Sequence, residues 1–310
     1  MRGREEKMSE VKTKKENRLK RSWGSIAFDA FNITFMFVLM IIMAYPLWHV
    51  VCASFSVPSQ LMRHIGPLYK PLGFTLSSYG MVFKNNMIML GYSNSIYILV
   101  VGTTINVILT AICAFVLSRK GVYWNSLFSK LIVLTMFIGG GLVPTYLVVT
   151  KMLHLNNNLW ALILPNAISV YNMIIMRTSF MGIPDSLEES AKLDGAGVWT
   201  ILFRIILPLS KAVIAVMILY YGVGYWNSWF DASIYLKDRE LYPLQLVLRE
   251  ILIANSTESM MDGVSNMDQE MVGETIKYSV IVLTTLPILA VYPFLQKYFV
   301  KGVMIGAVKG

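Results

Sequence analysis

Long apolar stretches separated by shorter polar ones dominate this chain. Six windows contain no Asp, Glu, Lys or Arg, and they cover residues 31–62, 85–118, 131–149, 152–176, 212–230 and 278–296. A bilayer core about 30 Å thick is crossed by roughly 20 apolar residues in a helix. The pattern therefore predicts an all-α membrane protein with six transmembrane helices, near residues 26–52, 91–118, 131–150, 160–178, 209–231 and 276–298.

The third of these spans contains an interruption. Gly139, Gly140 and Gly141 stand inside it, and Pro144 follows them. Irregular backbone at membrane depth is tolerated only where protein or a water-filled cavity covers it. We expect a helix break here, which is either a gating hinge or a packing kink.

Composition and charge fix the expected orientation. The chain has 310 residues, of which 55% are hydrophobic and 15% charged, and its net charge is +9. Of the 27 Lys and Arg residues, 19 fall in four groups. These are nine residues before position 22, then Arg119, Lys120 and Lys130, then Arg177, Lys192, Arg204 and Lys211, and finally Lys297, Lys301 and Lys309. Such residues collect on the cytoplasmic side of short loops. We therefore expect both termini in the cytoplasm, with a basic tail (residues 1–22), a transmembrane domain (23–310) and an acidic extracytoplasmic loop (232–275).

Other functional classes fit the sequence less well. A basic tail is also typical of binding to nucleic acid or anionic lipid, but here no aromatic residues alternate with the basic ones, and we expect no nucleic-acid partner. An ion-driven transporter normally carries ionisable groups within its spans. Here Asp29 lies near the inner end of the first span, and the cores of the remaining spans carry no such group. An embedded enzyme would need clustered ligands or catalytic groups. The histidines (His49, His64, His154) and the cysteines (Cys52, Cys113) do not have the spacing of metal ligands. We therefore expect no metal site and no catalytic residue, and we interpret the two cysteines as packing residues.

The polar stretch of residues 181–208 lies between two spans, on the expected cytoplasmic side. The sequence Pro-Asp-Ser that ends at Ser186 predicts a helix start, and Ser186 with Glu189 has the spacing of a capping box. Glu188 precedes Lys192 by four residues, which is the favourable order for an ion pair. These signals predict a short, charged helix.

A second short helix is predicted after Gly195. Asp194-Gly195 stops the first helix, because glycine readily takes the left-handed conformation of a helix end. The second helix covers residues 198–206 and is amphipathic through Trp199, Leu202, Phe203 and Ile206. The residues alone leave open whether this pair of helices is an ordinary cytoplasmic loop or a docking element for a soluble partner.

The spacing within this loop resembles a known family. Glu189-Ser190-Ala191, three residues, Gly195, nine residues and then a sequence ending in Leu207-Pro208 resemble the EAA loop of ABC importer permeases. Ser190 departs from the usual alanine by a small-for-small change. Four further segments are similar to carbohydrate-uptake permeases, most of all to those for aldouronates and complex oligosaccharides, and they are residues 138–149, 171–180, 224–230 and 296–310.

The resemblance implies a type I ABC importer permease fold and a defined set of partners. These are a second homologous permease, a dimer of ATPase subunits that binds ATP and magnesium, and an extracytoplasmic solute-binding protein that delivers a sugar or oligosaccharide. By similarity the EAA loop (residues 182–208) would dock on the ATPase through Glu188, Glu189, Ser190, Ala191, Leu193, Asp194, Gly195 and Ala196. We expect Trp199, Phe203 and Ile206 to join this loop to the membrane helices.

An aromatic segment in the fifth span is the second candidate site. Tyr221, Tyr225 and Trp229 are spaced by four residues and would share one helical face. Together with Trp226 and Asn227 they suit the faces and hydroxyl groups of a sugar, which makes this segment a candidate substrate path. Alternative interpretations are an interfacial aromatic belt or plain packing. Gly222 and Gly224 would permit close helix approach.

Overall fold

The computed structural model describes residues 23–253, 273–291 and 293, and these residues form helices and loops with no strand among them. Three of the described helices are long and apolar enough to cross a membrane. They are α2 (Trp23–Ser54), the continuous helix Asn86–Ser118 and the helix Gly273–Val291. Asn86–Ser118 comprises α5 (Asn86–Tyr97), the π-helical η1 (Ile98–Gly102) and α6 (Thr103–Ser118). They match the first, second and sixth expected spans.

The third and fourth expected spans are interrupted. The third consists of α7 (Asn125–Leu134), α8 (Leu142–Leu147) and η2 (Val148–Met152). The break before α8 confirms the expected interruption, because Gly141 has a φ of +81° there. The fourth is split into α9 (Trp160–Ile163) and α10 (Val170–Met181). Pro165 lies in this gap, and proline cannot donate the backbone hydrogen bond of a helix interior.

The fifth expected span, near residues 209–231, is right at its start to within two residues and wrong at its end. Its main helix is α14 (Lys211–Trp226), and the helical segment Val198–Leu209 meets it at a bend of 85°. Beyond Trp226 the chain turns and begins a separate helix, α15 (Phe230–Tyr235).

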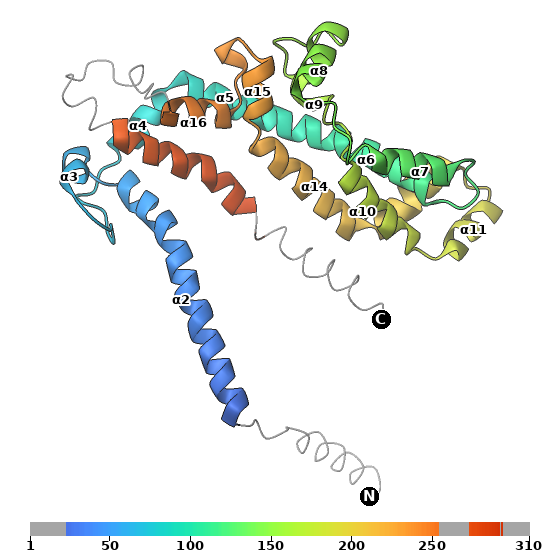
Figure 1. Ribbon diagram of the computed structural model, residues 1–310, viewed down its shortest axis with the longest axis horizontal. Coiled ribbons are helices and arrows are strands. Elements are labelled where there is room, and N and C mark those ends of the chain that lie inside the picture. Colours follow the sequence, from blue (N-terminus) through green and yellow to red (C-terminus); the bar gives the residue numbers. More distant parts are fainter. Residues whose placement is uncertain (1–22, 254–272, 292, 294–310) are drawn as a thin grey trace, which may run out of the picture.

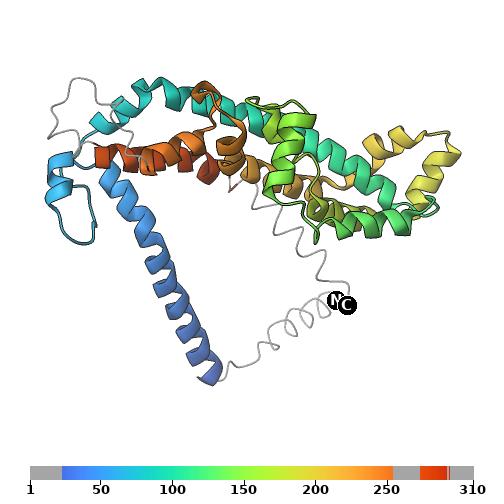
Figure 2. The ribbon, with the colours of Figure 1, turned by 45° about the horizontal axis from the view of Figure 1, so that its top comes forward.

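Helix α2 stands apart from the other helices and contacts them at its C-terminal end (Figures 1 and 2). Its buried residues are Cys52, Ala53 and Ser54, all in the last turn. There the hydroxyl groups of Ser54 and Tyr79 are hydrogen-bonded at 2.8 Å. The burial of Cys52 agrees with its interpretation as a packing residue.

Three apolar clusters hold the remaining helices together. One joins α6, α10 and α14 to the residues before the bend, and its buried members include Phe115, Met176 and Ile206. Another joins η1, α9 and α15 to α16 (Leu244–Ile253), with Leu162 and Tyr225 among its buried residues. The third joins α4 (Ser77–Lys84), α5 and α16 to the helix Gly273–Val291 through Val82, Ile88 and Ile276. The first two share α14, and a pocket described below lies beside this helix.

Helices α3 (Pro58–Arg63) and α4 lie at the end of the molecule opposite α11 (Asp185–Leu193) (Figure 1). The 3₁₀ turn η4 (Arg239–Leu241) stands between α15 and α16 in the chain. Asn157 accepts hydrogen bonds from the backbone N–H groups of Lys237 and Asp238, at 2.9 and 3.0 Å. The loops before α9 and after α15 therefore lie on one face. Residues 254–272 of the expected outer loop lie outside the described residues.

Candidate functional sites

The EAA loop begins as expected but is capped differently. Its first helix is α11 (Asp185–Leu193), whose N-terminal flanking residue is Pro184. No side chain caps this end, so the predicted capping box between Ser186 and Glu189 is wrong. Ser186 lies inside the first turn instead of before it, where its hydroxyl group cannot serve as an N-cap. Asp185 places negative charge in the first turn, which favours the helix through its dipole.

Gly195 ends this helix, as the sequence predicts. Its φ is +80°, and its backbone N–H donates to the carbonyl of Lys192 at 3.0 Å. The N–H of Ala196 donates to the carbonyl of Ala191 at 2.9 Å. These two bonds satisfy carbonyl groups that a helix end leaves free, and they set the bend between the two short helices.

The second half of the EAA loop packs through different residues from those expected. It comprises α12 (Val198–Thr200), the π-helical η3 (Ile201–Ile206) and α13 (Leu207–Leu209). Ile201, Leu202 and Ile206 are buried, whereas Trp199 is 60% and Phe203 50% exposed. The expectation that Trp199 and Phe203 attach the loop to the bundle is therefore wrong. In a π-helix residues five apart are bonded, so Ile201 and Ile206 share the inward face.

The residues expected to meet an ATPase fall into three groups. Glu189, Ser190, Leu193, Asp194 and Gly195 are exposed. Ala191 and Ala196 are half-buried against the apolar cluster that contains Phe115. The Glu188 side chain is 13% exposed and forms ion pairs with Arg119 and Lys192, the second at 3.0 Å. The predicted pair with Lys192 is confirmed, but Glu188 turns toward its own chain rather than toward solvent.

A second ion pair lies on the surface of the same loop. Lys120 Nζ is 2.8 Å from Asp185 Oδ2, and both side chains are well exposed. The hydrogen bond and positive charge of Lys120 lower the pKa of the Asp185 carboxyl group below its usual range. The same contact raises the pKa of Lys120. Exposed pairs of this kind contribute little to stability because water screens them.

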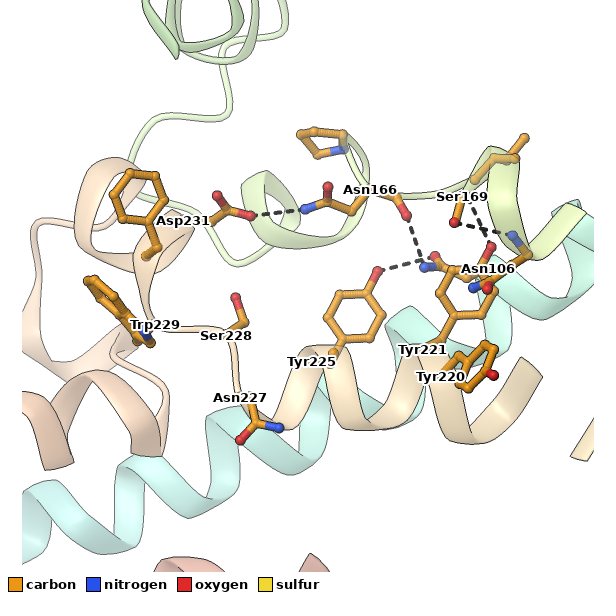
Figure 3. Close-up of a pocket in the computed structure, with 15 residues that line it drawn as sticks. Asn106, Asn166, Ser169, Tyr220, Tyr221, Tyr225, Asn227, Ser228, Trp229 and Asp231 are labelled. Atoms are coloured by element: carbon orange, nitrogen blue, oxygen red, sulfur yellow. Dashed lines mark hydrogen bonds between the residues drawn. The ribbon is translucent and has the colours of Figure 1, made fainter. Parts of the chain in front are cut away.

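An open pocket of about 570 Å³ lies beside α14 (Figure 3). Tyr221, Tyr225, Asn227 and Trp229 line it, as does Tyr220. Trp229 does not share the helical face of the two tyrosines, because α14 ends first and Trp229 immediately precedes α15. It reaches the pocket through that turn instead.

Trp226 lies outside this pocket. Its side chain is buried, and its indole N–H donates to the backbone carbonyl of Thr284 at 3.2 Å. Its ring also contacts Tyr92, with centroids 6.2 Å apart. Trp226 thus joins α14 to α5 and the helix Gly273–Val291, and the structure places it in packing rather than on the candidate substrate path.

A chain of polar groups crosses the pocket floor (Figure 3). Tyr225 Oη donates to Asn106 Oδ1 at 3.2 Å, and Asn106 Nδ2 donates to the carbonyl of Asn166 at 3.0 Å. Asn166 Nδ2 in turn donates to Asp231 Oδ2 at 3.0 Å. The sequence analysis did not predict Asn106, Asn166 or Asp231 as residues of this site. Asn106 could have been found as an amide inside an apolar span, and Asp231 as a carboxylate beside the aromatic segment.

Tyr221 ties three elements together at the other side of the pocket. Its hydroxyl group is 2.7 Å from Thr110 Oγ1 on α6 and accepts the backbone N–H of Ser169 at 3.0 Å. Aromatic faces, amides and hydroxyl groups in one open pocket are suited to a polyhydroxylated ligand. Within the described residues no cluster of His, Cys, Asp and Glu side chains could hold a metal ion.

The close approach of helices occurs at Gly102 rather than at Gly222 or Gly224. A Cβ atom at Gly102 would lie 2.6 Å from ring atoms of Tyr225. At Gly222 the nearest atom would be 3.9 Å away, and at Gly224 nothing lies within 4 Å. The expectation for the latter two glycines is therefore wrong.

Comparisons with known proteins decide the family, although no family model matches the chain. It is 40% identical over 285 residues to the polygalacturonan/rhamnogalacturonan transport system permease protein YtcP of Bacillus subtilis, covering 91% of this chain and 98% of YtcP. It is 42% identical over 284 residues to protein LplC of the same organism, covering 91% and 95%. A crystal structure of a bacterial ABC transporter that imports the acidic polysaccharide alginate matches with a TM-score of 0.82 and 26% identity, over 91% of this chain and 99% of that one. The chain belongs to the permeases of carbohydrate ABC transport systems.

This assignment confirms the resemblance seen in the sequence and the all-helical importer permease fold. The two candidate sites lie in different parts of the molecule. The EAA loop, which includes α11, lies at one end (Figure 1), and the pocket lies beside the C-terminal end of α14 (Figure 3). Helices α6 and α14 run between them.

Proposed function

We propose that this permease is the transmembrane subunit of an ATP-driven importer. It moves a sugar or oligosaccharide, delivered by an extracytoplasmic binding protein, into the cytoplasm by alternating access. The observation that carries the proposal is similarity to carbohydrate permeases along nearly the whole chain. The exposed EAA loop supports it, and the chain lacks a Gly-rich phosphate loop of the Walker A type. ATP and magnesium are therefore bound by separate ATPase subunits.

The exposed apolar surface supports a second permease as partner. Helix α2 is apolar on all sides and is buried only in its last turn. A helix that is hydrophobic all round is covered by lipid or by other protein. In this proposal, lipid and the homologous permease cover α2, and an ATPase dimer grips the exposed face of the EAA loop around Glu189 and Leu193.

The contacts between loops fit six spans with both termini in the cytoplasm. Arg119 and Lys120, which follow the second span, pair with Glu188 and Asp185 of the EAA loop. Both segments are expected inside. The loop around Asn157 bonds the segment 235–238, and both are expected outside. Each loop thus meets a loop assigned to its own side of the membrane.

The pocket beside α14 is the proposed substrate path. Asn106, Asp231 and the tyrosines that line the pocket offer hydrogen bonds. Trp229 also lines it, with the Arg249 guanidinium group over its ring, 4.2 Å from the centroid. Such a surface suits sugar rings and their hydroxyl groups. The named carbohydrates of the relatives include polygalacturonan, rhamnogalacturonan and alginate, and oligosaccharides of these polymers are the first candidates to test.

Co-purification is the direct test of the assembly. A tagged permease isolated from its own cells is expected to bring with it a second permease, an ATPase and a binding protein. Mass spectrometry would identify these partners and the sugar that the binding protein carries. Recovery of the permease alone under mild conditions, with no ATPase at any detergent concentration, would contradict the proposed function.

Two substitutions test the EAA loop itself. Glu189→Lys reverses an exposed charge, and Gly195→Pro cannot adopt a φ of +80° or donate to Lys192. We expect both variants to insert normally but to hydrolyse ATP without importing sugar in proteoliposomes. Gly197→Pro is the matched control, because Gly197 already has a φ of −72°. Normal uptake by the first two variants would rule out the role of this loop.

A further inference from the structure

The two adjacent glutamates of α11 have different surroundings. Glu189 is exposed, whereas the Glu188 side chain is 13% exposed and lies between Arg119 and Lys192. The Arg119 side chain is itself 15% exposed. The Glu188 carboxylate is thus bound within the chain.

Arg119 depends on Glu188 more than a surface arginine would. Its guanidinium group lies over the Phe115 ring, 4.7 Å from the ring centroid. Among the described residues its buried Nε and Nη2 atoms have no hydrogen-bond partner, and the one carboxylate in ion-pair contact with it is that of Glu188. Besides Lys120, Arg119 also helps through its charge to lower the pKa of the Asp185 carboxyl group, at longer range. Removing one member of a buried ion pair leaves an uncompensated charge, which is strongly destabilising.

The backbone that carries Arg119 is fixed from two sides. Asn125 Nδ2 donates to the carbonyl groups of Leu117 and Arg119, at 3.2 and 3.0 Å. Arg177 Nε on α10 donates to the same Leu117 carbonyl at 2.9 Å. The end of α6 is therefore joined to α7 and α10, and through the Arg119–Glu188 ion pair to α11.

We propose that Arg119 is a positioning residue that fixes α11 to the end of α6, so that these two helices move as one body. The inference rests on the proposed function, in which the EAA loop receives the movement of an ATPase. Helix α6 also carries Asn106 of the pocket, 13 residues or about 20 Å from Arg119 along the helix axis. The ion pair thus connects the EAA loop rigidly to α6, the helix that carries Asn106 of the pocket.

Distance measurements between spin labels test this rigidity in the intact transporter. The labels replace the exposed side chains of Ile108 on α6 and Leu187 on α11. With native Arg119 we expect one narrow distance distribution, unchanged between the nucleotide-free state and the state trapped with ATP and vanadate. Arg119→Gln should broaden it, and Arg119→Glu combined with Glu188→Arg should narrow it again.

Lys120→Gln is the matched control. It removes the neighbouring ion pair to Asp185, which is exposed, and should leave the distribution narrow. A narrow distribution in Arg119→Gln, or a nucleotide-dependent distance with native Arg119, would overturn the proposal.

A functional readout separates positioning from simple stability. In variants purified at equal yield, Arg119→Gln should reduce the stimulation of ATP hydrolysis by the binding protein by about fivefold or more, as expected for loss of coupling between sites. The charge-swapped pair should restore it, and undiminished stimulation in Arg119→Gln would overturn the proposal. If no ATPase associates with the native permease, the proposed function fails. The nucleotide-free distances of the permease alone then still decide whether Arg119 fixes α11.

Discussion

At the scale of single residues, Gly102 sets how closely α14 approaches the second span. A methyl group at this position would lie 2.6 Å from two ring atoms of Tyr225, and overpacking of this kind costs about 1–3 kcal/mol. We expect Gly102→Ala to lower the melting temperature of the purified permease, because Tyr225 must shift and weaken its bond to Asn106. Intrinsic tryptophan fluorescence during heating in lipid nanodiscs would measure this.

Gly222→Ala provides the control at the same interface. Its added methyl group would lie 3.9 Å from Thr103 Oγ1, an ordinary contact distance. Alanine also has a higher helix propensity than glycine, so this variant should melt no earlier than the native permease. Equal losses of melting temperature in both variants would show that the contact between Gly102 and Tyr225 is not tight.

At the scale of elements, the bend after α11 depends on one left-handed residue. The left-handed conformation costs roughly 1–2 kcal/mol for most residues, while asparagine visits it more readily. No atom of the permease would lie within 4 Å of a Cβ at Gly195. Asparagine and valine both add a side chain on the face expected to meet the ATPase, so comparing the two variants isolates the backbone conformation. We expect Gly195→Asn to keep ATP-dependent uptake near the native level and Gly195→Val to reduce it, measured in proteoliposomes. Equal uptake by the two variants would mean that the bend tolerates other conformations.

The short helices also show what local sequence can and cannot predict. The start of α11 and its end at Gly195 follow from proline and glycine, whose backbone limits act within a few residues. The inward face of η3 does not follow, since the α-helical spacing of Trp199 and Phe203 fails in a π-helical turn. The inward residues of η3 pack in the cluster that contains Phe115 of α6 and Met176 of α10, and periodicity alone does not reveal such packing.

At the scale of the whole molecule, the apolar windows were sufficient to predict an all-helical membrane protein, and the spacing of the EAA loop indicated its family. The pocket was predicted only in part. Asn166 and Asp231 are 65 residues apart yet hydrogen-bonded, and Arg119 meets Glu188 from 69 residues away. Such pairs form only where two particular helices pack together. The spacing of residues along one helix does not predict which other helix it contacts.

The orientation of the whole chain is the broadest expectation, and single-cysteine labelling tests it. Cys52 and Cys113 would first be replaced by serine. Ile65→Cys and Lys237→Cys would then mark the expected outer face, while Tyr123→Cys and Leu193→Cys would mark the inner one. All four native side chains are exposed. Because cationic residues accumulate beside the Tyr123 and Leu193 segments, a membrane-impermeant maleimide should label the first two in intact cells and the last two only after permeabilisation.

Expression without the ATPase is essential to this comparison, since a docked ATPase would cover Leu193. Tyr123 then serves as the internal control, because it lies outside the EAA loop but on the same expected side. Labelling of Leu193→Cys in intact cells would place the EAA loop outside, where no ATP is available, and would remove the basis for coupling. Labelling of Ile65→Cys and Lys237→Cys on opposite sides of the membrane would instead show that the number of spans between these positions is odd. The assignment to the carbohydrate permeases would not be affected.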